Sequence, residues 1–229
     1  MSLKSLLIKF AKKKIQENRI LEKWYGIRTE TKEFYGQFGE DASLQTFFSN
    51  QAWNSGVNPI NLEQGFYVDI GCYSPIRISN THWFYKRGWK GINVDLSTET
   101  ILAFTKARPS DINLVAAITN QEEVANANFF EFGLSSVYNT LDKESAKETE
   151  RLHGIKPVKR QIQAFGLKVL FEKYLPIDQK ISFLSIDAEG HDLEILKSNN
   201  WEKFRPKAII VEVREPNFHR LMNHDVVLF

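Results

Sequence analysis

Cysteine is nearly absent from this sequence, with Cys72 alone among 229 residues. A single thiol excludes an intrachain disulfide and any zinc site built from several cysteines. No apolar run reaches the roughly 18 residues that a membrane-spanning helix needs. The first residues also lack the apolar core of a signal peptide. We therefore expect a soluble, globular protein of the cytoplasm.

A large excess of either charge is also missing. The chain has 30 Lys and Arg residues against 28 Asp and Glu, a formal net charge of +2. This balance argues against a protein whose function is to bind nucleic acid.

Basic residues are concentrated only at the start of the chain. The first 24 residues hold seven Lys or Arg residues against two Glu, and their leucines recur at helical spacing. We predict a basic amphipathic helix in an extension over residues 1–30, followed by one domain over 31–229. Two interpretations of the helix are open. It attaches peripherally to the anionic inner face of the membrane, or it packs on its own domain or on a second copy of the chain.

The rest of the chain alternates short apolar runs with helical stretches. Continuous apolar runs of this length are typical of strands buried on both faces. A strand, a helix and a parallel strand in succession predict an α/β fold with a doubly wound, mostly parallel sheet. The predicted strands cover residues 66–70, 91–96, 112–118, 181–187 and 208–213, and the helices between them lie near 80–87, 98–107 and 191–199.

Two features depart from regular alternation. Residues 126–175 form an insertion, with strands predicted at 128–132 and 158–165 and helices at 139–153 and 167–174, and we expect it to cover the ligand-binding edge of the sheet. The second departure is at the C-terminal end, where only 16 residues follow Val213. That is too few for two more strands and their helices, so we expect a shortened C-terminal end.

Acidic residues and a glycine close the first two predicted strands. Asp69 and Gly71 end the first strand, where glycine permits a sharp turn and a close approach of ligand to backbone. Asp95 ends the second strand, where a carboxylate can accept both ribose hydroxyls of an adenosine ligand. Each acid also has a simpler explanation, Asp69 in a turn and Asp95 as a helix cap. Together, on neighbouring parallel strands, they favour an adenosine site.

The turn after Gly71 lacks the Gly-x-Gly-x-x-Gly pattern of dinucleotide sites. Without those glycines the backbone offers no cradle for a pyrophosphate, which argues against an NAD-dependent oxidoreductase. S-adenosylmethionine fits better, because it carries adenosine without phosphate. Nearby carboxylates would also attract its cationic sulfonium.

The fourth predicted strand runs into a turn that contains Asp187, Glu189 and His191. The end of such a strand lies at the ligand crevice. A helix N-terminus disfavours a protonated imidazole, so a neutral His191 could take a proton from a hydroxyl group. A divalent metal on Asp187 and a neighbouring acid is a further option, although no metal-ligand motif is present. The alternative is structural: Asp187 caps the helix, Glu189 is solvated and His191 starts the helix.

With these motifs the chain resembles the FkbM-type methyltransferases over about residues 34–214. The resemblance is specific because several motifs occur in the same order, namely those at residues 35–41, 66–71, 79–81, 87–89, 91–95, 183–191 and 205–206.

The resemblance implies a Rossmann-like sheet of the class I methyltransferase type and methyl transfer from S-adenosylmethionine to oxygen. We therefore expect an O-methyltransferase that acts on a sugar, a glycan or another small-molecule acceptor. The resemblance implies that Asp187 and Glu189 lie in the reaction region, and we expect Asp187 or His191 to act as the base and Glu189 to orient the acceptor. The resemblance implies that Asp69 and Gly71 contact the methionine part of the cofactor and Asp95 its ribose. The full set of cofactor contacts that we expect is Gln37, Glu40, Asp69, Gly71, Cys72, Asn80, Asp95 and Leu96.

The resemblance also leaves an alternative open. Relatives usually continue after the fifth strand to a closing antiparallel hairpin. A chain without those strands could be a remnant that binds the cofactor but is catalytically impaired. The open sheet edge would then be covered by the N-terminal helix or by the second subunit of a homodimer.

Overall fold

The structure is a computed structural model that describes residues 33–54, 64–133, 136, 138–188, 190–213 and 218–228. Residues 34–229 form one compact unit. The helix predicted over residues 1–24 lies outside the described residues. The extension over residues 1–30 and its membrane contact therefore stay predictions.

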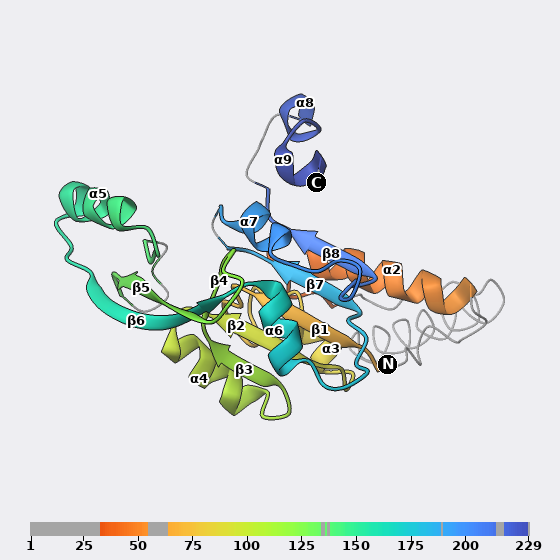
Figure 1. Ribbon diagram of the computed structural model, residues 1–229. Helices are drawn as coiled ribbons and strands as arrows, with labels where there is room; N and C mark the ends of the chain where they lie inside the picture. The colour runs from red at the N-terminus through yellow and green to blue at the C-terminus, as the bar shows by residue number, and fades with distance from the viewer. Residues whose placement is uncertain are drawn as a thin grey trace, which may run out of the picture. The chain divides into compact units, whose positions relative to one another are not determined.

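The centre of the unit is a five-stranded parallel sheet in the order β3-β2-β1-β7-β8 (Figure 1). The predicted doubly wound sheet is confirmed, because the chain builds β1, β2 and β3 outward and then returns to place β7 on the other side of β1. That return creates the switch point at which folds of this kind bind ligands. The strands are β1 (Phe66–Ile70), β2 (Lys90–Asp95), β3 (Ile112–Val115), β7 (Phe183–Ile186) and β8 (Ala208–Val211).

Helices cover both faces of this sheet because the strands are apolar on both sides. Val68 and Ile70 point into a core shared with α6 (Leu167–Tyr174) and α7 (Asp192–Lys197). Tyr67 points the other way, into a core shared with α2 (Glu40–Asn54) and α3 (His82–Tyr85). A further helix, α4 (Thr98–Ala107), packs through Ile101 and Phe104.

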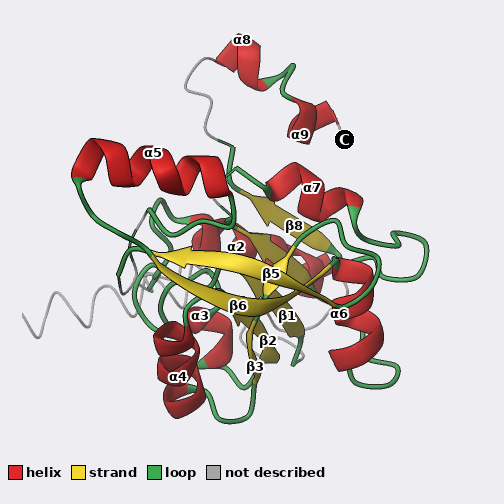
Figure 2. Cartoon of the chain, turned by 60° about the vertical axis from the view of Figure 1, so that its left-hand side comes forward, coloured by secondary structure: helices red, strands yellow, loops and turns green. Residues whose placement is uncertain are grey.

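The insertion forms a second sheet of β4 (Ala117–Ile118), β6 (Val158–Phe165) and β5 (Ala125–Glu131), in that order. β5 and β6 pair antiparallel, and α5 (Lys143–His153) stands over one end of this ribbon in both views (Figures 1 and 2). The inserted part ends with β6. The predicted helix at 167–174 is α6, which buries Leu167, Leu170 and Phe171 in the core of the main sheet.

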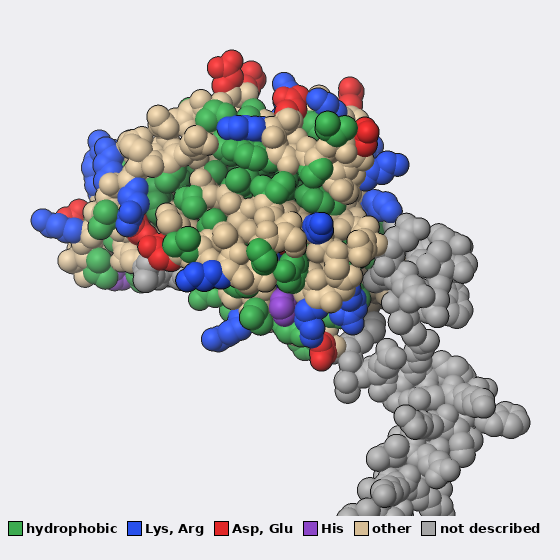
Figure 3. Space-filling view, turned by 90° about the horizontal axis from the view of Figure 1, so that it is seen from below, with side chains coloured by type: hydrophobic (Ala, Val, Ile, Leu, Met, Phe, Trp, Pro, Cys, Tyr) green, Lys and Arg blue, Asp and Glu red, His purple; other side chains and the backbone are tan. Residues whose placement is uncertain are grey.

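After β8 the described residues contain two short helices, α8 (Phe218–Leu221) and α9 (Asp225–Leu228), and no further strand. No helix of the described residues is long and apolar enough to cross a membrane. On the face seen from below, Lys and Arg side chains lie apart from one another among apolar and neutral ones (Figure 3).

Candidate functional site

A cleft of about 1010 Å³ opens where β1, β2 and β7 end. One side is formed by these strand ends and the start of α7, and the other by β4, β5 and the segment that leads into α5. The prediction that the insertion covers the ligand-binding edge is confirmed. The volume is at the upper end of the range for small-molecule sites, which is about 300–1,000 Å³.

Gly71 makes the turn that opens the cleft at β1. Its φ of +78° is in the left-handed region that favours glycine. Its amide donates to the carbonyl oxygen of Val94, 2.9 Å away, which holds the turn against β2. A Cβ at this position would lie 1.8 Å from the carbonyl oxygen of Asp187 on β7's side. The turn is therefore closed to any residue with a side chain.

Asp95 ends β2 and lines the cleft. Its Oδ1 accepts a hydrogen bond of 2.7 Å from the amide of Ser97, and Ser97 itself caps α4 by accepting from Thr100. Asp95 is thus not the helix cap. Burial raises the pKa of Asp95 to about 7, the Ser97 amide opposes the shift, and the charge of Asp69 adds to it. A carboxyl group in this state gains from hydroxyl donors, because they stabilise its charged form.

The β7–α7 turn places Asp187 and His191 in the same cleft. Asp192 holds this turn in shape: its buried carboxylate accepts from the amides of Ala188 and Gly190, each at 3.1 Å. His191 occupies the N-cap position of α7 but makes no side-chain cap hydrogen bond. His191 therefore does not cap the helix through its side chain, and both Asp187 and His191 line the cleft.

The charges of the cleft have one sign. Among the described residues that line it, none is Lys or Arg. Such a site attracts a cation and disfavours phosphate groups, which basic side chains ordinarily hold. The acidic members of the lining are Asp95, Asp142, Asp187 and Glu194, and His191 is the one imidazole among them.

Behind the cleft, a buried polar network ties Asp69 to the main fold. Its Oδ2 accepts from the Thr81 hydroxyl at 3.1 Å, and that hydroxyl in turn accepts from Arg108 at 2.7 Å. Arg108 is 0% exposed and also donates to Pro75 O and Ser79 Oγ. Burial raises the pKa of Asp69, and the Arg108 charge opposes that shift. The network fixes the segment after Gly71, which reaches the cleft at Ile78.

The sequence-predicted cofactor residues fall into two groups. Gln37, Gly71, Asp95 and Leu96 line the cleft. The others lie behind it, and each is engaged within the protein: Glu40 accepts from the Phe38 amide, Asp69 belongs to the buried network, Asn80 donates to Ser185, and Cys72 packs against Ile101 and Phe104. Their contact with a cofactor stays a prediction.

Of the predicted catalytic residues, Asp187 and His191 come together in the cleft, whereas Glu189 lies outside the described residues. Sequence reasoning missed Arg108, which had no assigned role, and Asp142, which starts a charged stretch that looked only like an exposed helix. The sequence does contain a signal for Asp142: an Asp followed two residues later by Glu144 is typical of a helix N-cap. No such signal could place it in the cleft that His191 also lines.

The described residues contain no group of three His, Cys, Asp or Glu side chains that could hold a metal ion.

Comparison with known proteins gives one match. The family model described as the methyltransferase FkbM domain matches residues 69–228. Its span begins at Asp69 and covers Gly71, Asp95, the insertion and the Asp187–His191 turn. No curated protein and no solved structure matches the chain.

Proposed function

Because the chain belongs to the FkbM methyltransferase family, we propose that it transfers a methyl group from S-adenosylmethionine to a hydroxyl oxygen of a neutral, sugar-like acceptor. One observation carries the proposal: an acid-lined cleft at the switch point of the sheet, with Asp95 at one end and the Asp187–His191 turn beside it.

The residues of the cleft suit this cofactor. Asp95 lines the cleft at the end of β2, where a carboxylate can accept the ribose hydroxyls, and Gly71 forms the turn that opens the cleft at β1. Acidic lining without Lys or Arg among the described residues favours a sulfonium cation over a dinucleotide. When bound, S-adenosylmethionine supplies an electrophilic methyl group.

The chain's own residues then have to orient the acceptor and remove its proton. An aliphatic hydroxyl is barely ionised at neutral pH, so a base within hydrogen-bond reach accelerates the reaction. His191 and Asp187 both line the cleft and can accept that proton. Asp192 keeps them in place by holding the backbone of the turn.

The insertion side of the cleft supports a neutral acceptor. It presents hydroxyl and amide groups from Asn126, Ser136, Asn139, Thr140 and Thr149, with the ring of Tyr138 beside them. Such groups both donate and accept, as the hydroxyls of a polyol require. An acceptor with phosphate or carboxylate near the reacting hydroxyl would meet Asp142 and Asp187 instead, and we expect it to be excluded.

The proposal is tested with the purified chain, labelled S-adenosylmethionine and a panel of neutral, acidic and phosphorylated glycans. We expect methylation of neutral members, and calorimetry should detect S-adenosylhomocysteine but not NAD. Asp187→Asn and His191→Asn should reduce turnover by about 10²–10⁴-fold with little change in cofactor affinity. Asp178→Asn, on an exposed loop outside the cleft, is the matched control.

Two results would overturn the proposal. Binding of S-adenosylhomocysteine without turnover on any panel member would favour a remnant that only binds the cofactor. Turnover that survives in both variants, with unchanged thermal melts, would exclude the β7–α7 turn as the catalytic site.

A further inference from the structure

Two exposed tyrosines line the cleft, one on each side of it. Tyr73 follows the Gly71 turn, and Tyr138 lies in the segment that leads from β5 into α5. Tyr73 is 53% exposed and Tyr138 is 39% exposed. Most of a tyrosine ring is apolar and is ordinarily buried, so a ring left accessible in a cleft offers a flat surface to a ligand.

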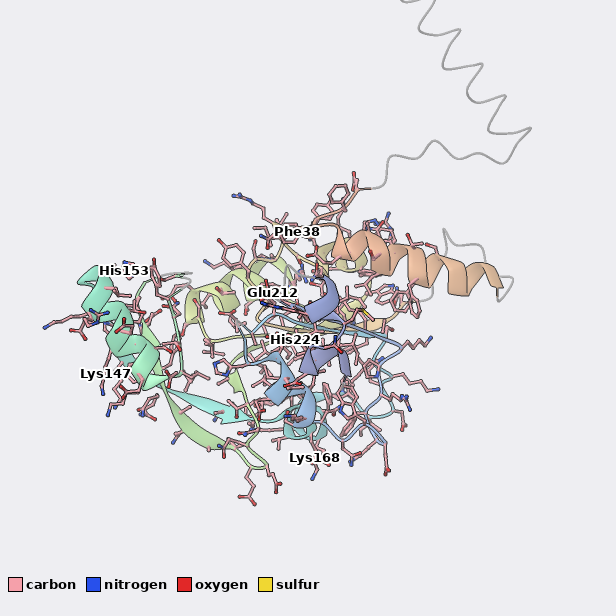
Figure 4. The ribbon with its side chains drawn as sticks, turned by 90° about the horizontal axis from the view of Figure 1, so that it is seen from above. Phe38, Lys147, His153, Lys168, Glu212 and His224 are labelled. Carbon is pink, nitrogen blue, oxygen red and sulfur yellow. The ribbon has the colours of Figure 1, made fainter. Side chains whose placement is uncertain are left out.

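Tyr138 differs from Tyr73 because two other rings hold it in place. The ring of His153, the last residue of α5 (Figure 4), lies 4.7 Å from the Tyr138 ring between centroids, at an interplanar angle of 34°. The ring of Phe132 lies 6.5 Å away at 73°. Within the described part of the chain, no ring packs against Tyr73 in this way. A ring that is already fixed loses little conformational freedom when a ligand binds to it.

Hydrogen bonds also fix the backbone on both sides of Tyr138. The Tyr138 amide donates to Ser136 Oγ at 3.3 Å, and the Asn139 amide donates to Ser136 O at 3.1 Å. The side chain of Asn139 accepts from the Phe132 amide at 2.8 Å and donates to Gly133 O at 3.1 Å. Tyr138 and the Phe132 ring that supports it are therefore held together by the backbone as well as by their ring contact.

The polar side chains on the same side of the cleft are mostly neutral. Asn126, Asn139, Thr140 and Thr149 line the cleft with Tyr138. A cyclic sugar has hydroxyl groups around its rim, which such groups can both donate to and accept from. Its ring also gathers C–H bonds on one face, and their weakly positive hydrogens are attracted to the negative face of an aromatic ring. An open-chain polyol has no such continuous apolar face.

We propose that the Tyr138 ring stacks on the C–H face of the acceptor and makes the site select cyclic sugars over open-chain polyols. This inference rests on the proposed function and names the acceptor class more closely. Tyr138 is then a specificity-determining residue that the insertion supplies, on the side of the cleft opposite the strand ends with Gly71 and Asp95. The cofactor and the sugar would thus be held by different parts of the fold.

The test is an NMR titration of the full chain with methyl hexopyranosides and with the matching open-chain hexitols. Stacking on an aromatic ring moves the C–H signals of the bound sugar upfield, so one spectrum reports both binding and stacking. We expect the pyranosides to bind more tightly, and Tyr138→Phe to keep this preference because the ring remains. Tyr138→Leu should weaken pyranoside binding by about 5–30-fold, the usual effect of losing an aromatic contact, and leave hexitol binding unchanged. In turnover, the loss should raise KM and leave kcat nearly unchanged.

Phe38→Leu is the matched control for the loss of an exposed ring. Phe38 is 83% exposed, lies before α2 (Figure 4) and is not among the residues that line the cleft, so this variant should bind both kinds of probe as the wild-type chain does. His153→Ala keeps the Tyr138 ring but removes one of its supports, and it should weaken pyranoside binding less than Tyr138→Leu does. Thermal melts show whether each variant is folded. If Tyr138→Leu unfolds, His153→Ala takes its place in the test.

The inference is wrong if the wild-type chain shows no preference for pyranosides, or if the preference survives in folded Tyr138→Leu. It is also wrong if Tyr138→Leu lowers the affinity for S-adenosylhomocysteine by as much as that for pyranosides, because the ring would then hold the cofactor. Failure of the proposed function looks different: the chain would bind pyranosides through Tyr138 and still transfer no methyl group to any member of the glycan panel.

Discussion

The carbonyl oxygen of Asp187 lies where the Cβ of any residue other than glycine at position 71 would have to be, at a calculated separation of 1.8 Å. The amide of Asp187 also donates to Ile70 O at 3.0 Å, so β1 and β7 remain paired to the edge of the cleft. Gly71 thus does two things at once: it turns the chain away from β1 and lets β7 reach the same level. The positions of the turn at Gly71 and of the turn after β7 therefore depend on each other.

Replacement of Gly71 by Ala should therefore damage both turns. We expect a loss of at least about 2 kcal/mol of unfolding free energy, from the left-handed backbone and from the clash with Asp187. Urea unfolding measures the loss. Gly154→Ala is the control, because Gly154 also has a positive φ, +67°, but no atom within 4 Å of its Cβ position. A loss no larger at Gly71 than at Gly154 would contradict the importance of the β1–β7 contact.

The raised pKa of Asp95, about 7, predicts a pH dependence of stability. The ordinary carboxyl pKa in an unfolded chain is about 3.9. Between these values the unfolded chain releases the proton more readily, so the stability that protonated Asp95 contributes is lost as pH rises from about 4 to about 7. Melting temperatures across this range should fall more for the wild-type chain than for Asp95→Asn. If the melting temperatures of both proteins change equally with pH, the pKa of Asp95 is not raised.

The affinity for the cofactor should rise with pH, whereas the stability of the chain should fall. Ribose hydroxyls donate best to a charged carboxylate, so S-adenosylhomocysteine should bind the wild-type chain more tightly as pH rises through 7. Asp95→Ala should weaken binding by about 2–3 kcal/mol and abolish this dependence. Calorimetry at several pH values makes the measurement. Glu99→Gln, an exposed acid in the first turn of α4, should change neither property.

The main strands were predictable because a strand buried on both faces is a continuous apolar run. The run at 66–70 is β1, and the alternation at 158–165 is β6. Asp95 and the Asp187–His191 turn could be placed at one edge because parallel strands end together.

The role of Arg108 could not be predicted from the sequence. Two of its partners, Tyr67 and Thr81, are 41 and 27 residues away in the sequence, and only the fold brings them to the guanidinium. A threonine just before a helix is ordinarily a cap. Thr81 makes no such hydrogen bond and instead joins Asp69 to Arg108.

The basic extension over residues 1–30 predicts binding to anionic membranes. The full chain should sediment with vesicles that contain phosphatidylserine and not with neutral vesicles, because Lys and Arg side chains are attracted to anionic lipid. Exchange of Lys12, Lys13 and Lys14 for Glu should abolish this binding. If binding is absent in the wild-type chain but light scattering finds a dimer, the extension or the sheet edge serves self-association instead.

Arg108 leads to the last prediction, because two hydroxyl groups connect it to two buried acids. Its guanidinium donates to the Tyr67 hydroxyl at 3.3 Å, and that hydroxyl donates to Asp111 Oδ2 at 2.6 Å. The Thr81 hydroxyl links it to Asp69 in the same manner. Burial raises the pKa of both acids, and the Arg108 charge opposes the shift in each. The Arg108 cation thus stabilises two buried carboxylates, each through one bridging hydroxyl group.

Arg108→Met should therefore cost about 3–5 kcal/mol of unfolding free energy, the usual result of leaving a buried charge without its partner. Arg87→Met is the matched control. Arg87 is exposed and lies over the Trp83 ring, so its loss should cost about 1 kcal/mol or less. Adding Asp111→Asn to Arg108→Met should recover part of the stability, since one uncompensated acid is then removed, and a double-mutant cycle measures the coupling. If Arg108→Met costs no more than Arg87→Met, or if the two effects at 108 and 111 simply add, the network does not hold the segment behind the cleft as its hydrogen bonds indicate.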